Sequence, residues 1–255
     1  RAPNLSGLKS VVMISSLLGN GVTNTNLSSP PRLPPRLFLK GLSMPDPREA
    51  PTTTEMALLA PFPGLPLERI RVPETEAEFA AAAADLAQHR FLGFDTESRP
   101  TFRKGEVSQG PHVVQLTTLQ TAYIFQLHRV DCREVLGQLL EAPNLVKVGF
   151  GLKSDREGLQ RKLGITARSV LDLTAVFRLD GYRKAVGVRA AVAIMFNQRL
   201  RKSRSVTTSN WAMPNLTPNQ LLYAANDAYA AIQVLHALNK PESELPIADH
   251  SSQPG

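Results

Sequence analysis

The sequence lacks the features that mark secreted and membrane proteins. Its 255 residues contain one cysteine, Cys132, which excludes an internal disulfide and a cysteine-rich zinc site. A lone thiol of this kind is expected to be buried or idle, and the composition suits a reducing compartment. No run of about 18 apolar residues occurs, so no transmembrane helix is predicted. We therefore expect neither a disulfide partner nor a membrane partner.

Acidic residues are missing from two long stretches. Residues 1–44 contain five Lys or Arg and no Asp or Glu, and residues 181–204 contain seven Lys or Arg and no acid. With a net charge of +7, this distribution favours a polyanionic partner, although a run of charge is also typical of a solvated face. We expect six side chains of the second stretch to contact nucleic-acid phosphates: Arg183, Lys184, Arg199, Arg201, Lys202 and Arg204.

The sequence divides into three parts. Residues 1–65 are rich in proline, glycine and serine and have no long periodic stretch, which predicts a disordered or non-native leader. Residues 1–44 are typical either of a transit peptide or of sequence upstream of a native start at Met44 or Met56. Residues 66–240 form the predicted folded domain, and residues 241–255 a flexible tail. We expect a cytoplasmic protein, with organellar targeting through the leader as the alternative.

The folded domain alternates strands with helices. Helix starts are signalled by Thr75 with Glu78 and by Thr217-Pro218 with Gln220, because each threonine can cap a helix and each third residue can complete a capping box. The order of elements predicts an α/β fold, in which a mixed sheet carries helices on both faces. Strands are predicted at 90–97, 112–118, 122–127, 145–150 and 170–173, and helices at 75–88, 155–163, 132–140, 186–196 and 218–238.

Four carboxylates and a tyrosine lie in three separate motifs. FDTE contains Asp95 and Glu97, VGFGLKSD ends in Asp155, and YAAND contains Tyr223 and Asp227. Alternation along the strand places Asp95 and Glu97 on one face, and a helix places Tyr223 and Asp227 about one turn apart. Each motif alone is more often a solvated edge, a helix cap or an ordinary helical spacing. Together they predict a cluster of acids that meet from different elements.

Such a cluster suits hard divalent cations. Mg²⁺ and Mn²⁺ prefer carboxylate oxygens, and two such ions about 4 Å apart can serve both ends of a phosphodiester displacement. We therefore expect Asp95, Glu97, Asp155 and Asp227 to ligate two divalent ions. The other polar candidates have simpler interpretations: Asp172 is expected to cap a helix, His112 to make a local hydrogen bond, Lys104 to be solvated and Trp211 to anchor packing.

The ordered motifs resemble the DEDDy group of 3′–5′ exonucleases in the ribonuclease H-like superfamily. The likeness is to ribonuclease D and Werner-type exonuclease domains, and to stand-alone bacterial proteins with this domain. It covers residues 67–238 and rests on FDTES, HVVQLTTLQTAYIFQL, KVGFGLKSD and TTSNWAMPNLTPNQLLYAANDAYAA. The resemblance implies a five-stranded mixed sheet flanked by helices, and makes residues 66–240 an exonuclease domain.

The resemblance also implies roles for the site residues. Asp95, Glu97 and Asp227 match the ligands of the ion that holds the nucleophilic water, and Asp155 helps Asp95 to hold a second ion. Tyr223 matches the tyrosine that orients the water. The implied substrate is DNA or RNA with a 3′ hydroxyl end, and the implied product is a nucleoside 5′-monophosphate.

Three other functions fit parts of the sequence. A non-catalytic nucleic-acid-binding module would keep the fold with a broken site, whereas all five site residues are present here. A metal-dependent endonuclease would use the same chemistry and would differ in the fragments that it releases. A scaffold that binds acidic partners would leave the ordered spacing of the motifs unexplained.

Overall fold

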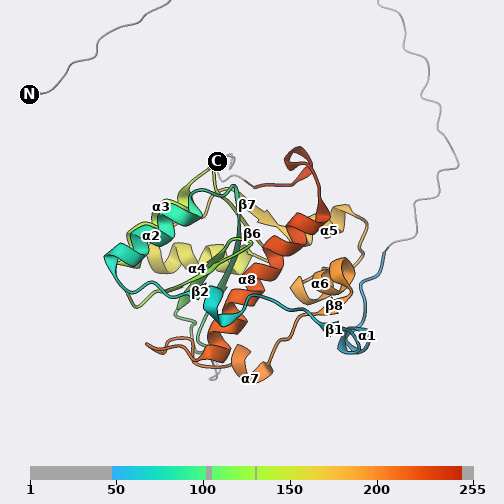
Figure 1. The fold of residues 1–255 in the computed structure, drawn as a ribbon, viewed down its shortest axis with the longest axis horizontal. Coiled ribbons are helices and arrows are strands. Elements are labelled where there is room, and N and C mark those ends of the chain that lie inside the picture. Colours follow the sequence, from blue (N-terminus) through green and yellow to red (C-terminus); the bar gives the residue numbers. More distant parts are fainter. Residues whose placement is uncertain (1–47, 102–104, 130, 249–255) are drawn as a thin grey trace, which may run out of the picture. The chain divides into compact units, whose positions relative to one another are not determined.

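The structure, a computed structural model, describes residues 48–101, 105–129 and 131–248 (Figure 1). The predicted leader before residue 48, the end of the predicted tail at 249–255, and Lys104 lie outside the described residues. No helix in the described part of the chain is long and apolar enough to cross a membrane.

A six-stranded mixed sheet forms the centre of the domain (Figure 1). Its β4 strand pairs antiparallel with both neighbours, while the other pairs are parallel. The prediction of an α/β fold with a mixed sheet is confirmed, and the five predicted strands are all present. The sixth strand, β2, has only two residues and lies at the edge, too short to give a periodic signal. The order is β2 (Ile70–Arg71), β5 (Ala122–Gln126), β4 (Val113–Thr117), β3 (Phe91–Glu97), β6 (Val146–Gly149) and β7 (Val170–Asp172).

Helices cover both faces of this sheet. Leu92 and Phe94 of β3 are fully buried against the face covered by α2 (Glu76–Leu86), α3 (Cys132–Glu141) and α4 (Lys153–Leu163). The opposite face packs against the helices of a second core, α5 (Leu173–Leu179), α6 (Val188–Phe196) and α8 (Pro218–Leu238). In Figure 1, α8 runs diagonally across the sheet. The predicted helix at 75–88 ends slightly earlier than expected, and α5 was not predicted from the sequence.

The α8 helix begins as its sequence predicts. Thr217 caps the first turn, Pro218 takes the first helical position, and Gln220 completes the capping box. The helix lies directly on β3, because Gly93 has no side chain between them. An ideal Cβ atom at position 93 would lie 2.1 Å from the carbonyl oxygen of Ala228. Small residues at this crossing bring the backbone of α8 to the strand that carries Asp95.

Residues 48–65, which we call the N-terminal strap, are folded. They contain α1 (Thr53–Ala57) and β1 (Ala60–Pro61), which pairs with β8 (Gln198–Arg199). A short 3₁₀ turn, η1 (Leu67–Arg69), then leads into the sheet. The prediction that residues up to 65 are disordered is therefore wrong for the strap. Its order comes from distant contacts, such as the hydrogen bond of 2.6 Å that the Leu65 N–H donates to Asn226 Oδ1, and no periodic pattern announces these contacts.

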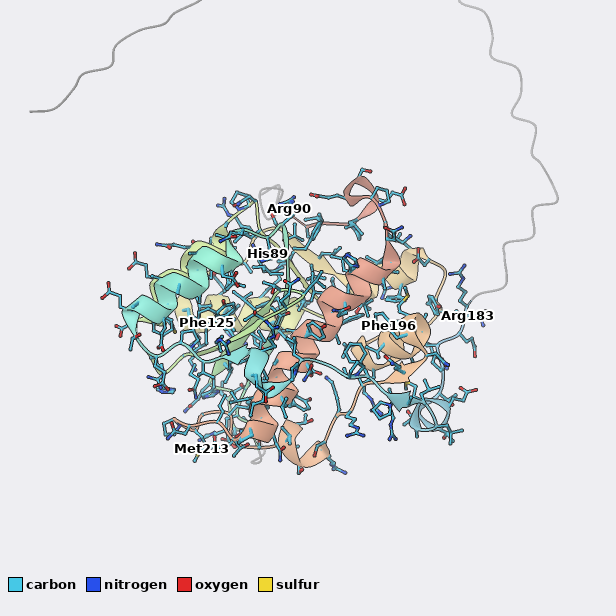
Figure 2. All side chains as sticks on the ribbon, viewed as in Figure 1. His89, Arg90, Phe125, Arg183, Phe196 and Met213 are labelled. Atoms are coloured by element: carbon cyan, nitrogen blue, oxygen red, sulfur yellow. The ribbon has the colours of Figure 1, made fainter. Side chains whose placement is uncertain are left out.

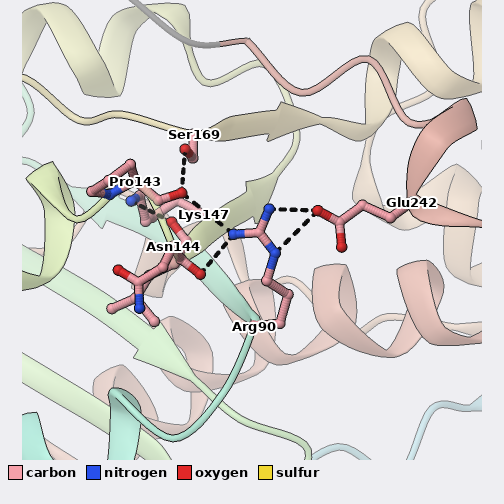
Figure 3. Close-up of polar contacts among 7 residues, drawn as sticks. Arg90, Pro143, Asn144, Lys147, Ser169 and Glu242 are labelled. Carbon is pink, nitrogen blue, oxygen red and sulfur yellow. Dashed lines mark hydrogen bonds and ion pairs between the residues drawn. The ribbon is translucent and has the colours of Figure 1, made fainter. Parts of the chain in front are cut away.

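The predicted flexible tail is also folded as far as residue 248. It contains η2 (Glu242–Glu244), and Leu245 is buried in the second core. Figure 3 shows Arg90 between Glu242 and two backbone carbonyls, with Nε donating to Glu242 Oε1 at 3.0 Å and Nη1 to the Asn144 oxygen at 2.7 Å. The flexible-tail prediction is wrong for residues 241–248, because their polar composition conceals these long-range contacts.

Gly93→Ala is expected to lower the free energy of unfolding. The added methyl group would force α8 away from β3, and overpacking of this kind costs about 1–3 kcal/mol. A urea unfolding curve measures the change. Gly137→Ala is the matched control, because no atom lies within 4 Å of its added Cβ and alanine favours the α3 helix. Equal stability of the two variants would contradict the close approach of α8 to β3.

Candidate active site

Three of the predicted acids meet at the end of β3. Asp95 and Glu97 project from the strand, and Asp227 approaches from α8, so that one carboxylate oxygen of each lies within 4.8 Å of the other two. The Asp227 carboxylate is buried, with 5% of its side chain exposed. Charged groups packed this closely repel one another, and a cation between them would relieve the repulsion.

Asp155 lies beside this group rather than within it. It belongs to the first turn of α4, which covers the opposite face of the sheet from α8. Its Oδ1 accepts a hydrogen bond of 2.5 Å from the hydroxyl of Thr96, the residue between Asp95 and Glu97. The predicted alternation of β3 explains this arrangement, because Thr96 faces α4 while its two acidic neighbours face α8. The charge of Asp155 still reaches the cluster, where it raises the pKa of Asp95.

Burial and mutual repulsion raise the proton affinity of the cluster. Burial, followed by the charges of Asp227 and Asp155, raises the pKa of Asp95 well above its usual value. Burial and the charges of Asp95 and Asp227 raise the pKa of Glu97 to about 9. Burial also raises the pKa of Asp227, against the opposing charge of Lys202. These carboxyl groups have been removed from water without enough positive charge to balance them.

Lys202 supplies the positive charge that the cluster does have. Its Nζ lies 2.5 Å from Asp227 Oδ2 and 5.4 Å from the centre of the Tyr223 ring. Burial opposes the charged form, but the Asp227 carboxylate outweighs it, so the pKa of Lys202 is raised and the ammonium stays protonated. We predicted Lys202 as a phosphate contact on the surface. The structure places it instead at the acidic cluster, with a quarter of its side chain exposed.

Tyr223 stands at the edge of the acidic cluster. It lies one turn before Asp227 on α8, and its hydroxyl accepts a hydrogen bond of 3.0 Å from the Thr207 hydroxyl. Thr207 ends the short helix α7 (Arg204–Thr207). The Tyr223 ring also packs against Trp211, with 5.9 Å between ring centres. The tyrosine is therefore held from two sides, with its hydroxyl close to the carboxylates.

Gln115 is a candidate site residue that the sequence analysis did not single out. It lies on β4 directly opposite Asp95 in the antiparallel ladder, so both side chains project from the same face. Its side chain is fully buried, and neither amide atom has a hydrogen-bond partner among the described residues. A buried amide without a partner is costly, which suggests that it serves the adjacent acidic site. A polar residue on the site face of an otherwise apolar strand was the available signal.

The simpler interpretations of the other polar residues hold. Asp172 caps α5 by accepting the Thr174 N–H at 2.9 Å, and the Nδ1 of His112 accepts the Arg99 N–H at 3.2 Å. Trp211 is buried as a packing residue. Cys132 is buried as well, and burial raises the pKa of its thiol to about 11.

The remaining predicted phosphate contacts occupy different surroundings. Arg199 is half-buried and donates a hydrogen bond of 3.0 Å to the Ala57 carbonyl of the strap. The other four side chains are exposed to solvent: Arg183, Lys184, Arg201 and Arg204. Arg183 lies at the outer margin of the domain beyond α6, whereas Arg201 directly precedes Lys202 (Figure 2).

Comparison with known proteins assigns the chain to a family. Residues 70–241, which are more than half of the sequence, match the family described as 3′-5′ exonuclease. The chain belongs to this family. The family match begins after the strap and contains all five predicted site residues.

Relatives of this exonuclease chain include larger proteins. The mouse bifunctional 3′-5′ exonuclease/ATP-dependent helicase WRN is 30% identical over 177 residues, which are 64% of this chain and 13% of that protein. A 3′-5′ exonuclease of Arabidopsis thaliana is 30% identical over 168 residues, which are 65% of this chain and 56% of that protein. The exonuclease chain thus spans about half of one relative and about an eighth of the other.

Solved structures share the fold of the exonuclease chain. Trypanosoma brucei RNase D matches with a TM-score of 0.62 and 19% identity, over 69% of this chain and 66% of that one. The Aedes aegypti Nibbler EXO domain matches with a TM-score of 0.58 and 23% identity, over 68% of this chain and 88% of that one. At these identities the likeness shows the fold alone, and it confirms the predicted ribonuclease H-like class.

The metal-free exonuclease chain is expected to lose stability as the pH rises from about 5 to about 9. The folded state holds a proton on Glu97 up to a pKa of about 9, whereas the usual value for the group is 4.5. The folded state therefore binds more protons than the unfolded state in this window, and its free energy of unfolding falls with pH.

Melting temperatures measured across this range in the presence of a chelator check the expectation. Glu97→Gln should flatten the profile, because it removes one of the titrating groups. Glu49→Gln, a change at an exposed position, is the control and should leave the profile unchanged. Identical profiles for the two variants would show that Glu97 is not perturbed by the cluster.

Proposed function

We propose that the chain is a metal-dependent 3′–5′ exonuclease that hydrolyses phosphodiester bonds from the 3′ end of nucleic acid. The observation that carries the proposal is the convergence of Asp95, Glu97 and Asp227 within 4.8 Å, with Tyr223 one helical turn away. Membership of the 3′-5′ exonuclease family supports the same reaction. The products are a nucleoside 5′-monophosphate and a strand one nucleotide shorter.

The donor set fits divalent cations such as Mg²⁺ or Mn²⁺. It consists of carboxylate oxygens from two elements, and the raised pKa values of Asp95 and Glu97 show that the cluster lacks positive charge. Asp95, Glu97 and Asp227 would hold one ion, and Asp95 with Asp155 would hold a second. The bound ions would supply an activated water and would stabilise charge on the leaving oxygen.

The side chains around the acids position the reactants. The Tyr223 hydroxyl orients the attacking water, and Thr207 and Trp211 keep the phenol in place. The Thr96 hydroxyl fixes Asp155 by its hydrogen bond. Water adds to phosphorus, the bond from phosphorus to the 3′ oxygen of the preceding nucleotide breaks, and that oxygen leaves as a new 3′ hydroxyl.

Nucleic acid with a 3′ hydroxyl end is the proposed partner, as DNA, RNA or both. An excess of positive charge on the chain supports a polyanion, and a solved structure of Trypanosoma brucei RNase D is in complex with RNA U12. Exposed Arg201 and Arg204 lie close in sequence to the acidic cluster and are the proposed phosphate contacts nearest to it.

Digestion of 5′-labelled single-stranded DNA and RNA oligonucleotides, with Mg²⁺ or Mn²⁺, tests the proposal. The label should appear in a ladder that shortens from the 3′ end, and it should be protected in chelator and with Asp95→Ala. Internal cuts would indicate an endonuclease instead. Intact oligonucleotides with folded protein and metal present would contradict the proposal and favour a non-catalytic binding module.

Tyr223→Phe is expected to slow turnover by about tenfold to a thousandfold while the protein remains folded. Only the hydroxyl is removed, and positioned groups of this kind contribute rates of this order. Single-turnover hydrolysis under saturating substrate measures the change. Thr207→Val, which removes the hydroxyl that donates to Tyr223, should give a smaller loss, because the ring remains packed against Trp211. A Tyr223→Phe variant as fast as the unaltered chain would exclude the water-orienting role.

A further inference from the structure

A groove beside Tyr223 is formed partly by residues outside the family match. It has a volume of about 640 Å³, within the range of ligand-binding clefts. One wall is formed by residues 61–65 of the N-terminal strap, a second by residues 200–206, and the third by the first two turns of α8. We call it the strap groove. Tyr223 lines one end, so the groove is continuous with the acidic site.

The strap is fastened to the helix that carries the site. Asn226, the residue before Asp227, accepts the Leu65 N–H at 2.6 Å and donates to the Leu65 carbonyl at 3.4 Å. Gly64 allows this approach, since a Cβ atom there would lie 2.3 Å from the Asn226 oxygen. The pairing of β1 with β8 fastens the other end of the strap. The wall of the groove is thus held at a fixed distance from Tyr223.

The lining combines an apolar wall with a polar, positive rim. Pro61, Phe62 and Pro63 give apolar surface, and the Phe62 ring is kept in place by Phe196, with 5.6 Å between ring centres. The rim presents the hydroxyls of Ser203 and Ser205 and the guanidinium of Arg201, and none of the described residues that line the groove is acidic.

This chemistry fits a flexible polyanion with flat apolar groups. Hydroxyl and guanidinium groups are typical contacts to phosphate oxygens, while proline and aromatic surfaces accept sugars and bases. A peptide or small metabolite would not explain why the groove ends at Tyr223. A single strand whose 3′ end enters the acidic site would need a path of this kind for its preceding nucleotides.

We propose that the strap groove binds the nucleotides that precede the scissile phosphodiester of a single-stranded nucleic acid, with Arg201 contacting a phosphate. The assignment rests on the proposed exonuclease function. It makes the N-terminal strap part of the substrate site, although the strap lies outside the residues shared with the family.

Arg201→Glu and Arg183→Glu are the matched pair that tests the groove. Both replace an exposed arginine and change the net charge equally, but only Arg201 lines the groove. The measurement is the fluorescence anisotropy of a short labelled oligothymidylate or oligouridylate in chelator, where hydrolysis does not interfere. Arg201→Glu should weaken binding by about tenfold or more and lower the salt dependence by about one phosphate contact. Arg183→Glu should change binding by less than about twofold.

The outcomes separate the groove from the proposed reaction. Equal weakening by both variants would show that only overall charge matters, and unchanged binding by Arg201→Glu would place the strand elsewhere; either result overturns the groove. Melting temperatures confirm that both variants are folded. Hydrolysis of thymidine 5′-monophosphate p-nitrophenyl ester by the unaltered chain, which needs no strand in the groove, tests the reaction separately. A chain that binds oligonucleotides through Arg201 but cleaves neither substrate would retain the groove and lose the exonuclease proposal.

Discussion

The close packing of α8 on β3 is the contact on which the site depends. At Gly93 the strand offers no side chain, and the carbonyl oxygen of Ala228 lies where a Cβ atom would be. This approach sets the position of Asp227 relative to Asp95 and Glu97. Like charges do not gather without an external force, and here the force comes from the apolar cores on both faces of the sheet. The stability of the fold thus holds together a cluster that would otherwise separate.

The electrostatics of the cluster follow from this forced proximity. Burial and repulsion favour protonated carboxyls, and Lys202 offsets only part of the negative charge. Asp155 adds to the charge from the other face of the sheet, through a hydroxyl rather than by direct contact. The chain therefore has an acidic site with partial internal compensation, which leaves room for added positive charge.

The sequence predicts what depends on local patterns. The capping boxes at Thr75 and Thr217 and the alternation of β3 were readable, because each is determined by residues a few positions apart. The strap, the packed tail and the position of Lys202 were missed. Their order comes from contacts such as Leu65 with Asn226, Arg90 with Glu242 and Lys202 with Asp227, which no local pattern encodes. Burial of Gln115 likewise becomes visible only when β4 is paired with β3.

The hydrogen bonds between Leu65 and Asn226 join two kinds of sequence. Asn226 lies within the family match and next to an acid of the site, while Leu65 precedes the match. The contact from the strap to the helix is made largely through the backbone of the strap, so many sequences of the strap can preserve it. The exposed faces of Pro61 and Pro63 are under no such constraint. Members of a family built in this way can alter one wall of the substrate path while the carboxylates keep their geometry, and preference for a strand can then diverge without any change in chemistry.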